Sequence, residues 1–312
     1  MPLSPSSHLS LRTFWIQMNS SFRRDLKIGR VFRQLSQVLL VSLCGCLTIN
    51  AQTSMISNGE TNETSFTITD KAGGLGFDLD KLTLVDEIFS KHLKSGKMIG
   101  GSALVIKDGK EIAYGQWGYR NQRRGEQLQR DTIFRIYSMS KPITSIAAMQ
   151  LVERGTLHLD APITDYLPEL KGLVVLDEKS ADGVVPLDRP MTTRDLMRHT
   201  SGLSYGFFGN TRVDQAYKKK GILVTDSSLE VTINKLSKIP LLHQPGETFH
   251  YSLSTDVLGR VIEVVSKMNF DDYLRKNIFE PLEMNDTFFS VPREKLDRFA
   301  LLYTPSRGKE LK

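Results

Sequence analysis

The stretch FRIYSMSKPITSIAAMQL, residues 134–151, places a lysine three residues after a serine at the start of an apolar helix. Pro142 fits only the first turn of a helix, which predicts that Ser138 lies at the helix N-terminus. Ser138 and Lys141 then share one helix face. Because N–H groups at a helix N-terminus favour developing negative charge, Ser138 is a candidate nucleophile.

The Ser138–Lys141 pair leaves two interpretations open on these residues alone. A lysine desolvated against an apolar helix has a lowered pKa and can take or hold a proton. The alternative is a serine cap beside a lysine whose stem lies along apolar surface. The S-x-x-K pattern is weak alone, since it also occurs as Ser306–Lys309 in a polar tail, where we take it as chance.

A second serine competes for the role of nucleophile. Ser204 lies in GLSYG, residues 202–206, which matches the G-x-S-x-G pattern of α/β-hydrolases. That pattern requires a strand before the serine and a helix after it. Residues 192–200 are predicted to be helical and residues 207–210 to be loop, so Ser204 is the weaker candidate.

A tyrosine in QPGETFHYSLSTDVLG, residues 244–259, is the third candidate group. A Pro-Gly turn precedes Tyr251, and an apolar helix follows it. A buried tyrosine near a lysine can accept a proton, because the ammonium group favours the phenolate. The alternative is a core tyrosine with a hydrogen-bonded hydroxyl.

The wider pattern predicts an α/β protein of the α+β type. Asp80 is a candidate cap for a helix that ends at Gly96, and residues 100–119 predict a hairpin that turns at an Asp-Gly pair. Further helices are expected in 138–154, 192–203 and 228–240, with two more in 253–282. We therefore expect an antiparallel sheet flanked by helices, plus a mostly helical subdomain after residue 155.

The N-terminal residues predict an export signal. Residues 1–51 hold six of the 41 Lys and Arg and one of the 35 Asp and Glu, so the remaining chain is almost balanced at 35 against 34. A basic segment precedes the apolar run 38–49, and a small residue, Ala51, offers a cleavage site. We therefore expect a periplasmic or secreted protein, with a lipoprotein anchored at Cys46 as the second alternative. Residues 52–76 are predicted to be a linker, and residues 77–312 to form one domain that carries the candidate site.

Composition argues against several classes of function. Without the leader, no basic excess indicates a nucleic-acid partner. Both cysteines lie in the leader, and the six histidines show no spacing typical of metal ligands. We therefore expect neither a metal nor a cofactor, and no cysteine nucleophile.

Four stretches together resemble the serine beta-lactamase-related hydrolases, namely class C beta-lactamases, D-alanyl-D-alanine peptidases and the esterases similar to them. The stretches begin IFRIYSMSKP, RPMTTRDLMRHTSGL, PGETFHYSL and IFEPLEMNDTFF, in the order of that family. The resemblance implies a beta-lactamase/transpeptidase-like fold. It also implies Ser138 as nucleophile, Lys141 as its proton partner, Tyr251 as general base, a structural turn at 199–203 and no catalytic role for Ser204.

Two departures from the family pattern shape the expected function. Leu253 replaces the asparagine that holds a substrate amide in the lactamases and peptidases, which favours esters. Nothing between Thr255 and Lys312 matches the family's third motif, such as Lys-Thr-Gly or His-x-Gly. We therefore expect a C-terminally truncated member that lacks the closing strands and is inactive as this chain.

These expectations converge on a serine hydrolase that acts through an acyl-enzyme on Ser138 and cleaves small-molecule esters or amides. A carboxylesterase-like activity is favoured, and a beta-lactamase or D-Ala-D-Ala carboxypeptidase is the alternative. A non-catalytic penicillin-binding-like protein that recognises a peptidoglycan-derived ligand is the alternative from a different class.

Overall fold

The computed structural model describes residues 66–223 and 227–303, which form two compact units. One unit contains the described residues up to Arg130 together with 301–303, and the other contains Asp131–Ala300. The domain expected over 77–312 spans both units. The expected export signal lies outside the described residues, as do residues 52–65 of the expected linker.

The first unit is a small antiparallel sheet with helices. Its elements are β1 (Thr67–Ile68), α3 (Lys71–Gly74), α4 (Leu79–Lys94), β2 (Gly100–Lys107), β3 (Lys110–Asn121) and β4 (Glu126–Gln127). The strand order is β1-β3-β2, and β4 pairs with β3. Because β1 pairs with β3, the end of segment 52–76 belongs to the fold, and its interpretation as linker is wrong there.

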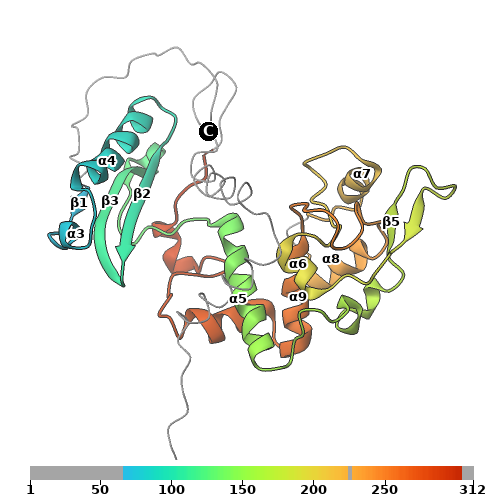
Figure 1. Cartoon of the computed structure of the whole chain (residues 1–312). Helices are drawn as coiled ribbons and strands as arrows, with labels where there is room; N and C mark the ends of the chain where they lie inside the picture. The colour runs from blue at the N-terminus through green and yellow to red at the C-terminus, as the bar shows by residue number, and fades with distance from the viewer. Residues whose placement is uncertain (1–65, 224–226, 304–312) are drawn as a thin grey trace, which may run out of the picture. The chain divides into compact units, whose positions relative to one another are not determined.

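The predicted hairpin is present, with Lys107 opposite Lys110. Asp108 and Gly109 both adopt positive φ, as a two-residue hairpin turn requires. Figure 1 shows α4 along one face of this sheet, where the Trp117 ring stacks on Phe89 at 4.0 Å between centroids. The cap of α4 differs from expectation: Asp78, not Asp80, accepts a hydrogen bond from the N–H group of Lys81.

The second unit is mostly helical. Its helices are α5 (Ser140–Glu153), α6 (Thr193–Arg198), α7 (Arg212–Lys219), α8 (Leu229–Leu236), α9 (Ser254–Ser266) and α10 (Phe270–Leu274), followed by a π-helical turn, Arg275–Phe279. Short 3-10 turns occur at Tyr137–Met139, Ile163–Asp165, Pro168–Leu170 and Arg293–Arg298. Strands β5 (Val174–Leu176) and β6 (Val184–Pro186) form a hairpin.

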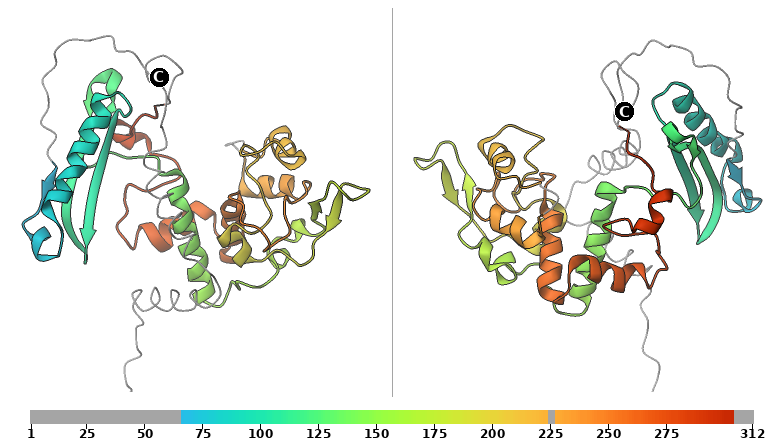
Figure 2. Two further views of the ribbon diagram at one scale, coloured as in Figure 1. Left: turned by 45° about the horizontal axis from the view of Figure 1, so that its top comes forward. Right: turned by 180° about the vertical axis from the view of Figure 1, so that it is seen from behind.

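Helices α5 and α9 hold the core of this unit. They lie side by side in both views of Figure 2. Ala147, Ala148 and Leu151 of α5 and Val257 and Leu258 of α9 are almost fully buried. Burial of a large aliphatic side chain contributes about 1.5–3 kcal/mol, so this packing fixes both helices. The residues just before the two helices are thereby held in place.

The antiparallel sheet, the flanking helices and the helical subdomain agree with the predicted fold class. Within the described residues, no helix combines the length and the apolar character needed to cross a membrane.

Candidate active site

The candidate nucleophile lies in a turn directly before α5. Ser138 belongs to the 3-10 turn Tyr137–Met139, so the α-helix begins two residues later than the serine. Pro142 falls in the first turn of α5, as predicted. Tyr137 has a φ of 42°, a left-handed conformation that is uncommon for a residue other than glycine. Such strain is concentrated at functional sites, and here it precedes an exposed serine.

The structure brings the three sequence-predicted site residues together. The hydroxyl of Tyr251 donates a hydrogen bond to Ser138 Oγ at 2.6 Å. Lys141 Nζ lies 3.4 Å from the same oxygen. The ammonium group also lies 4.9 Å from the centroid of the Tyr251 ring. Ser138 is therefore in contact with both groups that could exchange its proton.

A fourth group, Tyr205, belongs to this site and was not predicted. Its hydroxyl lies 2.9 Å from Lys141 Nζ, and the ammonium group lies 5.5 Å from its ring centroid. Sequence analysis considered only the neighbouring Ser204 in GLSYG. The available signal was the position of the tyrosine two residues after the turn that the family resemblance implies, although its contact with Lys141 is encoded by no local pattern.

The pKa of Lys141 is raised, contrary to the expectation of a lowered value. Burial lowers this pKa, but the Tyr205 and Tyr251 hydroxyls interact favourably with the ammonium group and outweigh that effect. The physical reason is that half-burial leaves the amine in contact with polar partners rather than with apolar helix surface alone. Lys141 is therefore a cation at neutral pH and is suited to stabilise negative charge.

The positive charge of Lys141 affects the pKa of two further ionisable groups, His199 and Asp256. Burial, followed by the positive charge of Lys141, lowers the pKa of His199 to about 4. Its Nδ1 accepts a hydrogen bond from the Ser252 N–H at 3.3 Å, which fixes the ring beside Tyr251. Burial raises the pKa of Asp256 on α9, although the charge of Lys141 partly opposes this shift.

A buried chain of hydroxyls ties the turn at 199–203 to the start of α9. Ser201 Oγ and Ser254 Oγ are 2.7 Å apart, and Ser252 Oγ is 2.7 Å from Ser254 Oγ. Gly202 has a φ of 82°, and a Cβ there would lie 2.1 Å from the His243 carbonyl oxygen. The turn expected at this place is thus present, and it positions both Tyr205 and Tyr251.

Ser204 is not placed as a nucleophile. Its side chain is fully buried, and its hydroxyl donates to Asp214 Oδ1 at 2.6 Å while accepting the Gly206 N–H. Helix α6 precedes it rather than a strand. Ser204 therefore holds the start of α7 in place through Asp214, which forms the capping box of that helix.

Leu253 occupies the position where an asparagine would contact a substrate amide. Its side chain is only 3% exposed and belongs to the hydrophobic core. Its N–H donates to the Ser204 carbonyl oxygen at 3.3 Å. The position thus contributes packing and offers no polar group to a ligand.

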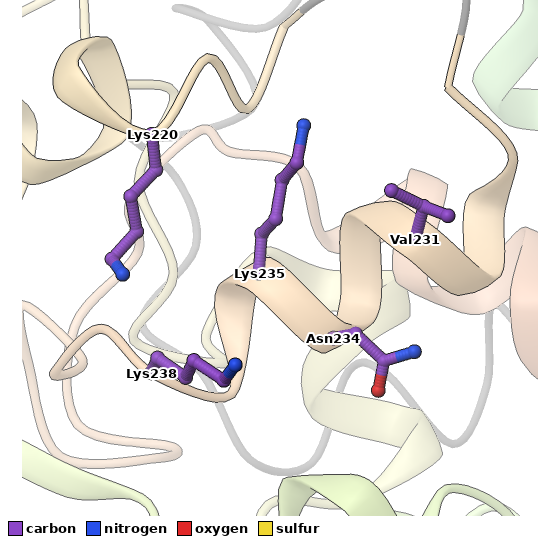
Figure 3. A pocket seen from close by; sticks show the side chains of 5 residues that line it. All are labelled: Lys220, Val231, Asn234, Lys235 and Lys238. Atoms are coloured by element: carbon purple, nitrogen blue, oxygen red, sulfur yellow. The ribbon is translucent and has the colours of Figure 1, made fainter.

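A surface hollow of about 280 Å³ lies elsewhere in this unit, between α8 and the end of α7. It is lined by Lys220, Val231, Asn234, Lys235 and Lys238. Figure 3 shows that the three amines point in different directions, so they do not converge on one ligand. None of the candidate catalytic groups lines it. Within the described ranges, no cluster of His, Cys, Asp and Glu has the makings of a metal site.

Comparison with known proteins identifies the family to which the chain belongs. The family described as Beta-lactamase matches residues 85–311. The chain belongs to the beta-lactamase family. This confirms the resemblance drawn from the four sequence stretches.

Relatives in this family include enzymes that act on esters and acyl groups. Esterase EstB from Burkholderia gladioli is 34% identical over 232 residues, which cover 73% of this chain and 56% of the esterase. Monacolin J acid methylbutanoyltransferase from Aspergillus terreus is 31% identical over 222 residues, or 68% of this chain and 52% of that protein. The chain thus spans about half the length of these relatives.

The fold is similar to that of a solved hydrolase. EstCE1, described as a hydrolase with promiscuous acyltransferase activity, superimposes with a TM-score of 0.66 at 28% identity. The match covers 75% of this chain and 60% of that one. It supports the predicted beta-lactamase/transpeptidase-like fold.

Proposed function

We propose that the protein is a serine hydrolase that cleaves carboxylic esters through an acyl-enzyme on Ser138. The observation that carries the proposal is the contact of one exposed serine oxygen with Tyr251 at 2.6 Å and with Lys141 at 3.4 Å. Similarity to EstB and EstCE1 supports an ester as the substrate. A single serine held against a proton acceptor and a cation is the usual arrangement for nucleophilic catalysis.

The geometry assigns different roles to the two partners of Ser138. Because Lys141 stays protonated at neutral pH, Tyr251 is the better proton acceptor. The Lys141 ammonium stabilises the phenolate form of Tyr251, which arises when the phenol releases its proton to solvent. The phenolate oxygen then takes the Ser138 proton as Oγ attacks the ester carbonyl carbon. Collapse of the tetrahedral intermediate breaks the C–O bond to the alcohol, and Tyr251 returns the proton to that leaving oxygen.

Deacylation reverses the same proton path. A water molecule gives a proton to Tyr251 and attacks the acyl carbon, and Ser138 recovers its proton when the carboxylic acid leaves. Tyr205 holds the Lys141 amine through its hydroxyl and is a positioning residue. Turnover on esters should also exceed turnover on lactams, because the buried Leu253 offers no partner to a substrate amide.

The proposal is tested on the full-length protein, extended through any downstream reading frame, by measuring hydrolysis of p-nitrophenyl acetate and nitrocefin in the wild type and in Ser138→Ala. We expect ester hydrolysis that is lost in Ser138→Ala, with a lower kcat/KM for nitrocefin in the wild type. Without a partner for its amide group, the lactam should lose about 1–3 kcal/mol of transition-state stabilisation, which lowers its kcat/KM by roughly five- to 150-fold. Hydrolysis that survives in Ser138→Ala would contradict the assignment, and a faster lactam reaction would favour the lactamase alternative.

We also propose that the protein is exported, on the strength of the basic and apolar segments within residues 1–51. N-terminal sequencing of the mature protein should find a start at Gln52. A mature protein that starts at Cys46 and carries lipid would support the lipoprotein alternative, and an intact N-terminus would contradict export by cleavage.

A further inference from the structure

Two phenylalanine side chains close to the active site are more than half exposed. Phe207 is 55% exposed and Phe208 is 61% exposed. Their rings pack against each other, with centroids 4.4 Å apart. Exposed apolar surface of this kind is typical of ligand-binding and interaction sites.

The two exposed rings are continuous with the catalytic groups. Phe207 and Phe208 contact the Tyr205 ring at 5.1 Å and 5.9 Å, and Phe208 contacts the Tyr251 ring at 6.2 Å. The hydroxyl of Tyr251 is 2.6 Å from Ser138 Oγ. We call these four rings, Tyr205, Phe207, Phe208 and Tyr251, the aromatic platform. Its tyrosine end lies at the reacting oxygen, and its phenylalanine end lies in solvent.

The charges around the aromatic platform select the chemistry of its ligand. The Lys141 ammonium already lies 5.5 Å and 4.9 Å from the Tyr205 and Tyr251 ring centroids, so a ligand cation would meet like charge there. A ligand carboxylate placed on Phe207 and Phe208 would lose hydration without gaining a partner from the phenyl rings. An uncharged apolar group avoids both costs and removes apolar ring surface from water.

We propose that the aromatic platform binds an uncharged hydrophobic group of the ester substrate while the ester carbonyl lies at Ser138. The inference rests on the proposed esterase function and adds the substrate class to it. Either the acyl chain or the alcohol of the ester can supply that group, and the two are distinguished by the experiment below.

The experiment compares chain-length preference in two substrate series. One series varies the acyl group, from p-nitrophenyl acetate to p-nitrophenyl hexanoate, and the other varies the alcohol, from ethyl acetate to hexyl acetate. Each buried methylene group contributes about fourfold to binding. We define the preference as the ratio of kcat/KM for the ester with the six-carbon chain to kcat/KM for the ester with the two-carbon chain of the same series. If two methylene groups lie on the rings, we expect the double variant Phe207→Ala/Phe208→Ala to reduce this ratio at least tenfold in one series.

A matched control is Phe289→Ala. Phe289 is 58% exposed, and its ring packs against Phe270 at 5.3 Å in a separate aromatic pair. This variant should keep the wild-type preference. Equal preferences in wild type and double variant across both series would overturn the proposal and indicate that the exposed rings serve another segment or protein.

Charge selectivity gives an independent check. Acetylcholine and 3,3-dimethylbutyl acetate have the same shape, but only the first is a cation. If the chain-length series places the alcohol on the rings, we expect the neutral ester to have the higher kcat/KM in the wild type, and a preference for the cation would contradict the proposal.

The proposal remains testable if no ester is cleaved. In that case the esterase function fails, and saturation-transfer NMR with 2-octanone, a neutral ketone that cannot be hydrolysed, measures binding alone. Saturation of the terminal methyl group that disappears in the double variant would support the aromatic platform without catalysis. The same saturation in wild type and double variant, or none in either, would overturn it.

Discussion

Substitution of Tyr205 by phenylalanine removes one hydroxyl group and leaves its ring in place. That hydroxyl lies 2.9 Å from Lys141 Nζ, a hydrogen bond to a charged group. Such bonds contribute about 1.5–3 kcal/mol. The substitution therefore removes about that much of the free energy that holds the Lys141 amine beside Ser138 and Tyr251. If the whole loss falls on the transition state, kcat/KM for p-nitrophenyl acetate decreases about 10- to 150-fold.

The pH profile separates this effect from a general structural defect. Tyr205 is the largest contributor among those that raise the Lys141 pKa, so its loss lowers that pKa. Because the proposed mechanism uses the cationic form of Lys141, the alkaline limb of the kcat/KM profile should move to lower pH in Tyr205→Phe.

A suitable control for Tyr205→Phe is Tyr273→Phe. The Tyr273 hydroxyl donates to Gln150 Oε1 and accepts from Arg154, each at 3.4 Å, and neither partner belongs to the candidate site. This variant should keep the wild-type alkaline limb. An unchanged kcat/KM and an unchanged alkaline limb in Tyr205→Phe would refute the role given to Tyr205.

Three further outcomes are expected. Asp195→Ala should lower the free energy of unfolding by about 2–4 kcal/mol in urea titrations, because the buried carboxylate caps α6 and accepts both Arg189 nitrogens. Since its pKa is lowered despite burial, chiefly by Arg189, the charge-dependent part of this contribution should decline as pH falls below about 4, the unfolded value, and be lost as pH falls through the lower pKa of the folded state. Gly202→Ala should lower the melting temperature, because its Cβ would overlap the His243 carbonyl oxygen. Ser204→Ala should keep the esterase kcat, although losing the bond to Asp214 lowers stability.

Much of the fold could be predicted because its local signals are strong. The Asp-Gly turn fixed the hairpin, and Pro142 placed the start of α5 to within two residues of the structure. The hairpin of β5 and β6 was missed, since three-residue strands are too short to show alternation. Helix α7 was missed because its eight residues are mostly polar and its capping box ends in Asp214 rather than Glu or Gln.

The candidate site was only partly predictable, for a related reason. Ser138 and Lys141 are neighbours in sequence, so their proximity follows from helix geometry. Tyr205 reaches Lys141 across 64 residues, and no local pattern encodes that contact. The raised pKa of Lys141 depends on the same contact, which is why the lowered value expected from an apolar helix was wrong.

The most direct test of the central claim is the site and rate of labelling by a fluorophosphonate, because only an activated serine reacts with this probe. The test uses the full-length protein, extended through any downstream reading frame. The wild type and the variants Ser138→Ala, Tyr251→Phe and Lys141→Met should be treated in parallel and digested for peptide mass spectrometry. We predict one adduct on Ser138 in the wild type, none on that peptide in Ser138→Ala, and labelling at least tenfold slower in the other two variants. An adduct on Ser204 that persists in Ser138→Ala, or an unreactive Ser138 in the folded wild-type protein, would contradict the account.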